Sequence, residues 1–156
     1  MARRGQISKR LPQPDVKYGN VTVSKLINKL MERGKKSTAE GILYSALQII
    51  ETQEGKPPVS VLEQAIKNAS PLLMVKARRV GGATYQVPME IEPERGAEIA
   101  IRWILQAARS RKGKAMAEKL AAEVTEASKE QGNTIKKRED THKMAEANRA
   151  FAHYRW

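Results

Sequence analysis

The chain has 156 residues, with 29 lysines and arginines against 17 aspartates and glutamates, and its formal net charge is +12. This length suffices for one domain with its own core, and so large a basic excess favours a nucleic-acid partner. The sequence has no cysteine and two histidines, which excludes disulfides and thiolate metal sites and argues against a histidine metal site. It has neither the roughly 20 apolar residues of a membrane span nor a secretory signal, so we expect a soluble intracellular protein.

The basic excess is concentrated near the N-terminus. Residues 1–36 carry ten basic and two acidic side chains, a balance that makes up two thirds of the net charge. Residues 91–130 are almost neutral, with eight basic and seven acidic side chains. A concentrated excess indicates a binding face rather than a general adjustment of solubility.

The first 36 residues contain a predicted arm and a predicted helix. Residues 1–19 show no apolar periodicity and are expected to form an extended basic arm that becomes ordered on a partner. From Asn20, apolar residues recur at the i, i+3, i+4, i+7, i+8 spacing, which predicts a helix capped by Gly34.

Three cations, Lys25, Lys29 and Arg33, would form a stripe along the outer side of this first helix. Like charges at i, i+4 destabilise an isolated helix, and only Glu32 is near enough to relieve them. The stripe therefore favours binding to an external anion, with a solvated helix face as the alternative.

Two further helices are predicted, each beginning with a capping box, in which a glutamate follows a serine by three residues. The pairs are Ser37 with Glu40 and Ser60 with Glu63. Gly55 would end the earlier of these helices and Pro71 the later one.

The hydrophobic period then changes to two on either side of Gly81 and Gly82, which predicts an antiparallel β-hairpin over residues 72–91. Pro88 has no amide hydrogen, so its strand must be an edge strand at that point. Because a lone two-stranded ribbon is marginally stable, we expect it to project from a helical body.

Three more helices are predicted after the hairpin. Pro93 opens a fourth helix that is apolar around most of its circumference, as expected of the central buried helix. A fifth follows Gly113 and ends near Gly132, and a weaker sixth begins at about Asn133. Residues 149–156 are aromatic, basic and aperiodic, and are expected to form a tail. The predicted fold is one mainly α domain spanning all 156 residues, a bundle of about six helices with one projecting hairpin and basic terminal tails.

The predicted fourth helix carries Arg95, Arg102 and Arg109 at intervals of seven, so the three guanidinium groups would form a column. Such a column can bind successive phosphates. The alternative is pairing within the molecule, with Glu98 or with carboxylates on a neighbouring helix. Arg102 lies beside Trp103 and is the arginine we expect most to be structural.

The predicted hairpin carries Lys76 and Arg78 on one face and Arg79 on the other, with Tyr85 across from them. Glycines at the tip let the backbone approach a ligand closely, the cations can meet phosphates, and the tyrosine ring can stack on a base. The alternative is an edge that the charges keep soluble. No acidic residue lies between Pro71 and Met89, which favours binding.

Other charged segments give weaker signals. On the predicted fifth helix, Lys114 with Glu118 and Lys119 with Glu123 are opposite pairs at i, i+4, which indicates an ordinary solvated face. Residues 136–138 are a basic triplet, but two acidic residues follow at once, so binding and solvation stay equally supported.

The sequence contains no Gly-rich phosphate loop, no nucleophile elbow and no paired carboxylates on the apolar scaffold, so we expect no enzyme, no cofactor and no small-molecule substrate. The sequence at this point supports two hypotheses for a nucleic-acid-binding protein. One is a structural RNA-binding protein. The other is an architectural DNA-binding protein with a β-ribbon arm, although the Gly-Gly-Ala tip lacks the apolar wedge of such arms. An enzyme of RNA metabolism would need a pocket that includes a shifted carboxylate or His142.

Three segments carry a resemblance to a known family: residues 75–90 of the predicted ribbon, the Ile101-Arg102-Trp103 core, and the ending over residues 144–156. Together they closely resemble bacterial-type protein seven of the small ribosomal subunit, and the match runs along the whole chain. The resemblance implies a primary binder of small-subunit ribosomal RNA at the 3′ major domain, which nucleates assembly of the subunit head. It further implies a ribbon near the exit-site transfer RNA and messenger RNA path, contacts with head and platform proteins, and a cytoplasmic ribosome, with a plastid ribosome also compatible.

The candidate site residues come from both lines of reasoning. Those expected to face ribosomal RNA are Arg3, Arg4, Lys9, Arg10, Lys25, Lys29, Lys35, Lys36, Lys76, Arg78, Arg79, Arg95, Arg102, Arg109, Lys114 and Met116. Those expected near transfer RNA and messenger RNA are Arg78, Arg79, Gly81, Gly82, Tyr85, Arg149, Arg155 and Trp156.

Overall fold

The computed structural model describes residues 12–154 of the chain. Its described elements are six α-helices, one 3₁₀ helix and one two-stranded antiparallel sheet, so the mainly α fold with a single hairpin is confirmed. In chain order they are α1 (Val21–Leu30), α2 (Lys36–Glu54), α3 (Pro58–Ala69), β1 (Leu73–Val80), β2 (Ala83–Glu90), α4 (Pro93–Ser110), α5 (Met116–Ser128), α6 (Asn133–Ala147) and the 3₁₀ helix η1 (Arg149–Tyr154).

The hydrophobic core lies mainly among α1 to α5, and Ile135 of α6 also belongs to it. α1 to α5 supply its largest side chains. Each of these helices contributes at least one fully buried aliphatic side chain, and the apolar periodicity seen in the sequence is what turns these positions inward. Examples in helix order are Leu26, Leu43, Leu62, Ile104 and Leu120. None of the helices in the described part of the chain is both long and apolar enough to cross a lipid bilayer.

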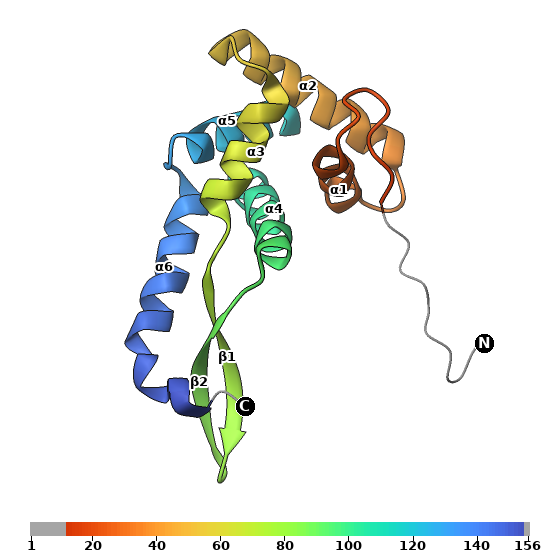
Figure 1. Cartoon of the computed structure of the whole chain (residues 1–156). Coiled ribbons are helices and arrows are strands. Elements are labelled where there is room, and N and C mark those ends of the chain that lie inside the picture. Colours follow the sequence, from red (N-terminus) through yellow and green to blue (C-terminus); the bar gives the residue numbers. More distant parts are fainter. Residues whose placement is uncertain (1–11, 155–156) are drawn as a thin grey trace, which may run out of the picture.

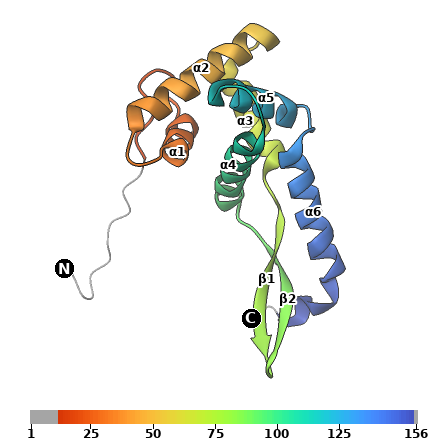
Figure 2. The same ribbon diagram turned by 180° about the vertical axis from the view of Figure 1, so that it is seen from behind.

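The β-ribbon extends from this helical body, and α6 runs alongside it on one side (Figures 1 and 2). α6 contacts both strands, and η1 contacts β2. The register pairs Lys76 with Val87 and Arg78 with Tyr85, and Val87 is fully buried. A two-stranded ribbon is marginal by itself, so the packing of α6 and η1 against it supplies burial that the hairpin lacks. Residues 149–154 therefore form a packed 3₁₀ helix and not the aperiodic tail that we expected, and the last two residues of that predicted tail lie outside the described part of the chain.

The ends of the first two helices differ in part from the prediction. The helical pattern begins after Asn20 as expected, and Asn20 caps α1, because its side chain accepts hydrogen bonds from two amides of the first turn. The helix ends at Leu30 with Met31 as its cap, so Gly34 is not its cap and lies in the following loop. Gly55 ends α2 in the left-handed conformation with φ +62°, as predicted.

Both predicted capping boxes are wrong. α2 begins at Lys36, so Ser37 is already inside the helix and makes no cap. α3 begins at Pro58, because proline at the first helical position has its φ already set for a helix. Ser60 instead donates its hydroxyl to the carbonyl of Pro57 at 2.7 Å.

The predicted arm is shorter than expected. Residues 1–11 lie outside the described part of the chain, but residues 12–19 belong to the helical body. Asp15 is only 8% exposed, and Tyr18 packs against the core. A hydrogen-bonded turn at residues 15–19, anchored by the buried Asp15, thus takes the place of part of the expected extended segment.

Candidate nucleic-acid interface

α1 and α4 bring predicted site residues together although they are far apart in the sequence. Lys29 of α1 and Arg102 and Arg109 of α4 line one shallow groove. Lys25 and Lys29 line an adjoining groove with Glu98. Because Lys29 belongs to both grooves, the two form one continuous surface along the α1–α4 seam.

A third groove extends this surface beyond the end of α1. Arg109 also lines a cavity of about 430 Å³ with Arg33, Lys35 and Met116. Each groove shares a lining residue with the next, so their cations form one connected surface. We call this surface the basic track, and its cations are Lys25, Lys29, Arg33, Lys35, Arg102 and Arg109.

The stripe predicted on the first helix is only partly present. Lys25 and Lys29 lie on α1, but Arg33 lies beyond the helix with a φ of +53°, in the left-handed region. Glu32 does not relieve the lysines. Its carboxylate pairs with Arg109 at 2.9 Å, and Arg109 also donates to the carbonyl of Leu30 at 3.3 Å.

The arginine column on α4 divides into three cases. Arg109 is the one that pairs within the molecule, through the contacts just described. Arg102 is exposed despite its position beside Trp103, so the expectation that it is the structural arginine is wrong. The physical reason is that neighbouring residues point in different directions around a helix. The side chain of Trp103 points into the protein and is 8% exposed, whereas that of Arg102 points outward. Arg95 is also exposed, near the start of α4.

The ribbon tip has the geometry that its sequence predicts. Gly81 and Gly82 have φ values of +56° and +93°, which only glycine adopts easily in a tight hairpin turn. Lys76 and Arg79 are exposed, and Arg78 is half-buried and interacts within the chain. The tip is therefore accessible, with cations on both faces of the ribbon.

Tyr85 is already in contact with aromatic rings of the same chain. Its ring lies 5.2 Å from that of Phe151 and 5.1 Å from that of Tyr154, centroid to centroid. These contacts attach η1 to β2 and cover part of the ring that we expected to stack on a base. Arg149 begins η1 and is exposed.

Of the two ion pairs predicted for the fifth helix, only the pair of Lys114 with Glu118 is present. Lys114 is exposed and lies 3.8 Å from Glu118. The predicted pair of Lys119 with Glu123 is wrong, because the side chain of Glu123 is fully buried and pairs with Arg111 instead. Glu123 occupies a core position of α5, so its carboxylate is not accessible to solvent.

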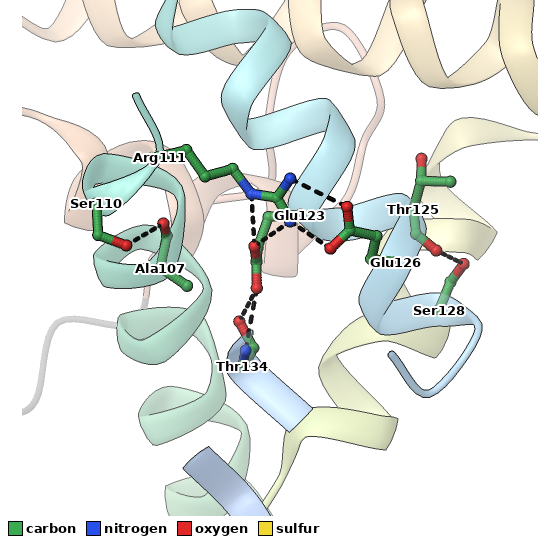
Figure 3. Close-up of polar contacts among 8 residues, drawn as sticks. All are labelled: Ala107, Ser110, Arg111, Glu123, Thr125, Glu126, Ser128 and Thr134. Carbon is green, nitrogen blue, oxygen red and sulfur yellow. Dashed lines mark hydrogen bonds and ion pairs between the residues drawn. The ribbon is translucent and has the colours of Figure 1, made fainter. Parts of the chain in front are cut away.

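Arg111, Glu123 and Glu126 form a charged cluster where α4, α5 and α6 meet (Figure 3). Arg111 Nε donates to Glu123 Oε2 at 2.8 Å, and its terminal nitrogens donate to both oxygens of Glu126. The other oxygen of Glu123 accepts from the amide of Thr134 at 3.1 Å and from its hydroxyl. Glu123 thus caps the N-terminus of α6, where Gly132 has no side chain to do so. Hydrogen bonding to Glu126, supported by Glu123, raises the pKa of Arg111 against the opposing effect of burial.

Sequence reasoning also missed a contact between the N-terminal turn and α2. Tyr44 donates its hydroxyl to Asp15 at 2.7 Å, and this bond raises the pKa of Tyr44 to about 12. The sequence does carry a local signal for the turn, because Asp15 and, four residues later, Gly19 are residue types typical of turns. No local signal identifies Tyr44 or Arg111, because their partners are distant in the sequence.

Two members of the basic triplet at residues 136–138 are used within the molecule. Lys137 donates to Gln106 at 2.7 Å and lies 5.7 Å from the centre of the Trp103 ring. Arg138 donates to the backbone carbonyl of Asn68. The remaining residue of the triplet, Lys136, is exposed.

The part of the chain over residues 12–154 offers no metal-ligating cluster, and its two histidines have other roles or positions. Among these residues, no group of three or more histidine, aspartate or glutamate side chains could hold a metal ion. His142 accepts a hydrogen bond from the amide of Leu72 at 3.1 Å, which joins α6 to the base of the ribbon. Six predicted site residues lie outside the described part: Arg3, Arg4, Lys9, Arg10, Arg155 and Trp156.

Comparison with known proteins agrees with the resemblance noted from the sequence. The family model for ribosomal protein S7p/S5e matches residues 2–149. The chain is 58% identical to the small ribosomal subunit protein uS7 of Dehalococcoides mccartyi and to that of Moorella thermoacetica, and 57% identical to that of Thermomicrobium roseum. Each of these matches covers 100% of both chains. The chain therefore belongs to the ribosomal protein S7 family, whose members are structural components of the ribosome and not enzymes.

Proposed function

We propose that this small-subunit ribosomal protein is a primary binder of small-subunit ribosomal RNA at the 3′ major domain and nucleates assembly of the subunit head. The observation that carries the proposal is the basic track, in which six cations line three adjoining grooves. Two carboxylates line the same grooves, and one of them, Glu32, is already paired with Arg109. The excess of cations is left for an external polyanion.

The mechanism is electrostatic and requires no bond chemistry. Phosphates that contact the track displace condensed counterions, so affinity falls as salt rises. Arginine guanidinium groups can hold a phosphate through two parallel hydrogen bonds, which fixes orientation as well as charge. Double-stranded RNA is recognised mostly by shape, and a rigid seam between two packed helices suits such recognition.

The ribbon would form a second contact surface, next to the exit-site transfer RNA and messenger RNA. Lys76 and Arg79 are exposed, and a Cβ atom built at Gly81 or Gly82 would meet no atom within 4 Å, so the tip has open space around it. Head and platform proteins of the small subunit are the expected protein neighbours, in a cytoplasmic ribosome. Membranes and small molecules have no role in this function.

The test is competition binding between a head fragment of small-subunit RNA and duplex DNA of equal length, over a salt series. The track variant carries Lys25→Gln, Lys29→Gln and Arg102→Gln. We expect it to lower the slope of log affinity against log salt by about 0.7 to 0.9 for each phosphate that the variant no longer neutralises. Equal affinity for RNA and DNA at every salt concentration would contradict the proposal and favour an architectural DNA-binding protein.

A matched control separates the track from net charge. Lys56→Gln, Lys67→Gln and Lys143→Gln remove the same number of charges from exposed positions outside the track. We expect this control to keep most of the affinity for head RNA. If both triple variants weaken binding equally, net charge and not the track is responsible.

A further inference from the structure

A groove at the base of the β-ribbon lies apart from the basic track. It has a volume of about 560 Å³ and lies where the ribbon meets the helical body, beside α3, α4 and α6 (Figure 1). Volumes of about 300–1,000 Å³ are typical of sites for small ligands, so the groove suits a few side chains rather than a whole domain. We call it the ribbon-base groove, and its lining includes Ile66, Lys67, Leu72, Ile91, Arg138 and His142.

An exposed leucine lines this groove. Leu72 is 71% exposed although its side chain is aliphatic. Its backbone is held on both sides, because its amide donates to His142 Nε2 at 3.1 Å and its carbonyl accepts from the amide of Ile91 at 3.0 Å. Ile66 and Ile91 add further apolar surface to the same groove. A ligand that covered this surface would remove apolar area from water, which is favourable.

The groove also contains a lysine whose expected partner is engaged elsewhere. Glu63 precedes Lys67 by four residues on α3, a spacing at which glutamate and lysine commonly pair. Glu63 Oε1 instead accepts a hydrogen bond from Asn20 Nδ2 at 2.8 Å. The ammonium of Lys67 makes no ion pair or hydrogen bond within residues 12–154. Lys67 is exposed, so its charge is available to an acidic group from outside.

Arg138 supplies a second cation, with a donor that is not satisfied. One of its terminal nitrogens donates to the backbone carbonyl of Asn68. Its Nε is buried and makes no hydrogen bond within the described residues. Buried donors are nearly always paired, and an unpaired one costs free energy. Because Arg138 lines the groove, an acceptor carried by a ligand would offset that cost.

The lining of the groove suits a protein segment better than RNA. Among residues 12–154, no phenylalanine, tyrosine or tryptophan lines the groove, so a base has no such ring to stack on. The carboxylate of Glu63 also lines it and would repel a phosphate. Aliphatic surface next to two cations matches a peptide segment in which a carboxylate follows or precedes an aliphatic side chain.

We propose that the ribbon-base groove binds a segment of a neighbouring small-subunit protein, whose aliphatic side chain covers Leu72 and whose adjacent carboxylate pairs with Lys67 beside Arg138. The inference rests on the proposed function, because it gives one of the expected protein neighbours a place on this chain. The groove shares no lining residue with the three grooves of the basic track. The segment and the RNA can therefore be bound at the same time.

The first experiment identifies what covers the groove. Leu72 is replaced by the photoreactive residue p-benzoylphenylalanine in the full chain, which is assembled into small subunits, irradiated and analysed by mass spectrometry. We expect a cross-link to a segment of another small-subunit protein that has a carboxylate next to an aliphatic residue. Val16 is the control position, because it is fully exposed and lines none of the grooves described, and it should not cross-link to that segment. Cross-links from position 72 only to RNA, only to this chain itself, or to nothing would overturn the proposal.

The second experiment measures the apolar part of the contact. The cross-linked segment is synthesised as a labelled peptide, and its affinity for the full chain is measured by fluorescence anisotropy. Leu72→Ser should weaken binding roughly tenfold, because the variant no longer offers the aliphatic area that the peptide covers. Val16→Ser removes a fully exposed aliphatic side chain elsewhere and should bind like the native chain. Equal affinity of the native chain and Leu72→Ser would overturn the proposal.

The third experiment tests the charge pair by reversal. Lys67→Glu should weaken peptide binding roughly threefold to tenfold, whereas Lys56→Glu, at an exposed position outside the groove, should have little effect. A peptide whose acidic residue is replaced by lysine should bind Lys67→Glu better than it binds the native chain. A misfolded variant could not show this reversal, and its absence would overturn the pairing. Arg138 is left unchanged because it also bonds Asn68.

The outcomes separate this inference from the proposed function. Thermal unfolding of each variant, followed by circular dichroism, shows whether the body is intact at the binding temperature. If the chain binds head RNA but position 72 cross-links to no other protein, this inference fails and RNA binding by the track stands. If the chain prefers duplex DNA to head RNA, the proposed function fails, and this inference fails with it.

Discussion

Arg111 and Glu123 form an ion pair, with 2.6 Å between Arg111 Nη2 and Glu123 Oε2, in which the carboxylate is completely buried. The arginine follows α4, the glutamate lies on α5, and the second carboxylate oxygen caps α6 (Figure 3). One side chain therefore links three helices. Because α6 supports the ribbon, this cluster also ties the ribbon to the helical body.

Replacing Glu123 by Gln should destabilise the protein strongly. The change removes the charge that pairs with Arg111 inside the protein, and breaking a buried pair costs far more than breaking a surface pair. Because Arg111 is 23% exposed and keeps its pair with Glu126, we expect a loss of about 3 kcal/mol in the free energy of unfolding, the lower end for a broken buried pair, measured by urea denaturation. On the same helix, Glu118→Gln removes an exposed partner 3.8 Å from Lys114 and should cost less than about 1 kcal/mol. Similar losses of unfolding free energy in the two variants would show that burying the ion pair does not increase its contribution to stability.

Gly132→Ala should also be destabilising, for a backbone and a steric reason. Gly132 has a φ of +92°, and a Cβ atom there would lie 2.9 Å from Glu126 Oε2. We expect a cost of about 1–3 kcal/mol in urea unfolding. Gly41→Ala is the matched control, because Gly41 lies within α2 and a Cβ atom would meet nothing within 4 Å. That variant should gain about 0.5–1 kcal/mol, and a loss there would refute the helix-propensity argument.

The Tyr44 hydrogen bond predicts a stability change in alkaline solution. The bond to Asp15 raises the pKa of Tyr44 from 10.0 to about 12, so the folded chain keeps the phenol proton at pH values where the unfolded chain loses it. The contribution to stability is therefore complete below pH 10 and is lost as the pH rises from 10 to about 12. The difference in unfolding free energy between the native chain and Tyr44→Phe should shrink across that interval.

The measurement is a series of urea unfolding curves at rising pH, together with an absorbance titration of tyrosinate. Tyr18→Phe serves as the control and should keep the steeper pH dependence of the native chain. If Tyr44→Phe and the native chain lose stability in parallel with pH, the hydrogen bond does not contribute.

The contact of Tyr85 with Phe151 should couple the ribbon to η1. Rings at a centroid distance of 5.2 Å pack favourably, and a double-mutant cycle with Tyr85→Ala and Phe151→Ala should give a coupling of about 0.5–1.5 kcal/mol. Hydrogen exchange should become faster at residues 149–154 in Tyr85→Ala. Gln86→Ala, at an exposed position on the opposite face of β2, should leave that exchange unchanged. Unchanged protection in Tyr85→Ala would mean that η1 is held by other contacts.

Local patterns in the sequence were enough to predict the helices and the hairpin. The apolar spacing around Leu26 and the paired glycines at residues 81 and 82 depend only on residues within one or two turns of each other in the sequence. The structure has the helix and the hairpin where these patterns predicted them. The capping boxes failed because one serine-glutamate spacing fits several helix starts. At Ser60, Pro58 decided the start instead.

The sequence by itself determined the fold class, the hairpin and the family, since each depends on local patterns or long matching segments. Only the tertiary structure decided which charges are available to a partner. Glu32 turns to Arg109, Glu123 turns inward to Arg111, and Lys29 shares a groove with Arg102 across the α1–α4 seam. Helix packing brings these side chains together although they are distant in the chain, and electrostatic pairing depends on that distance and on burial, which no local pattern reports.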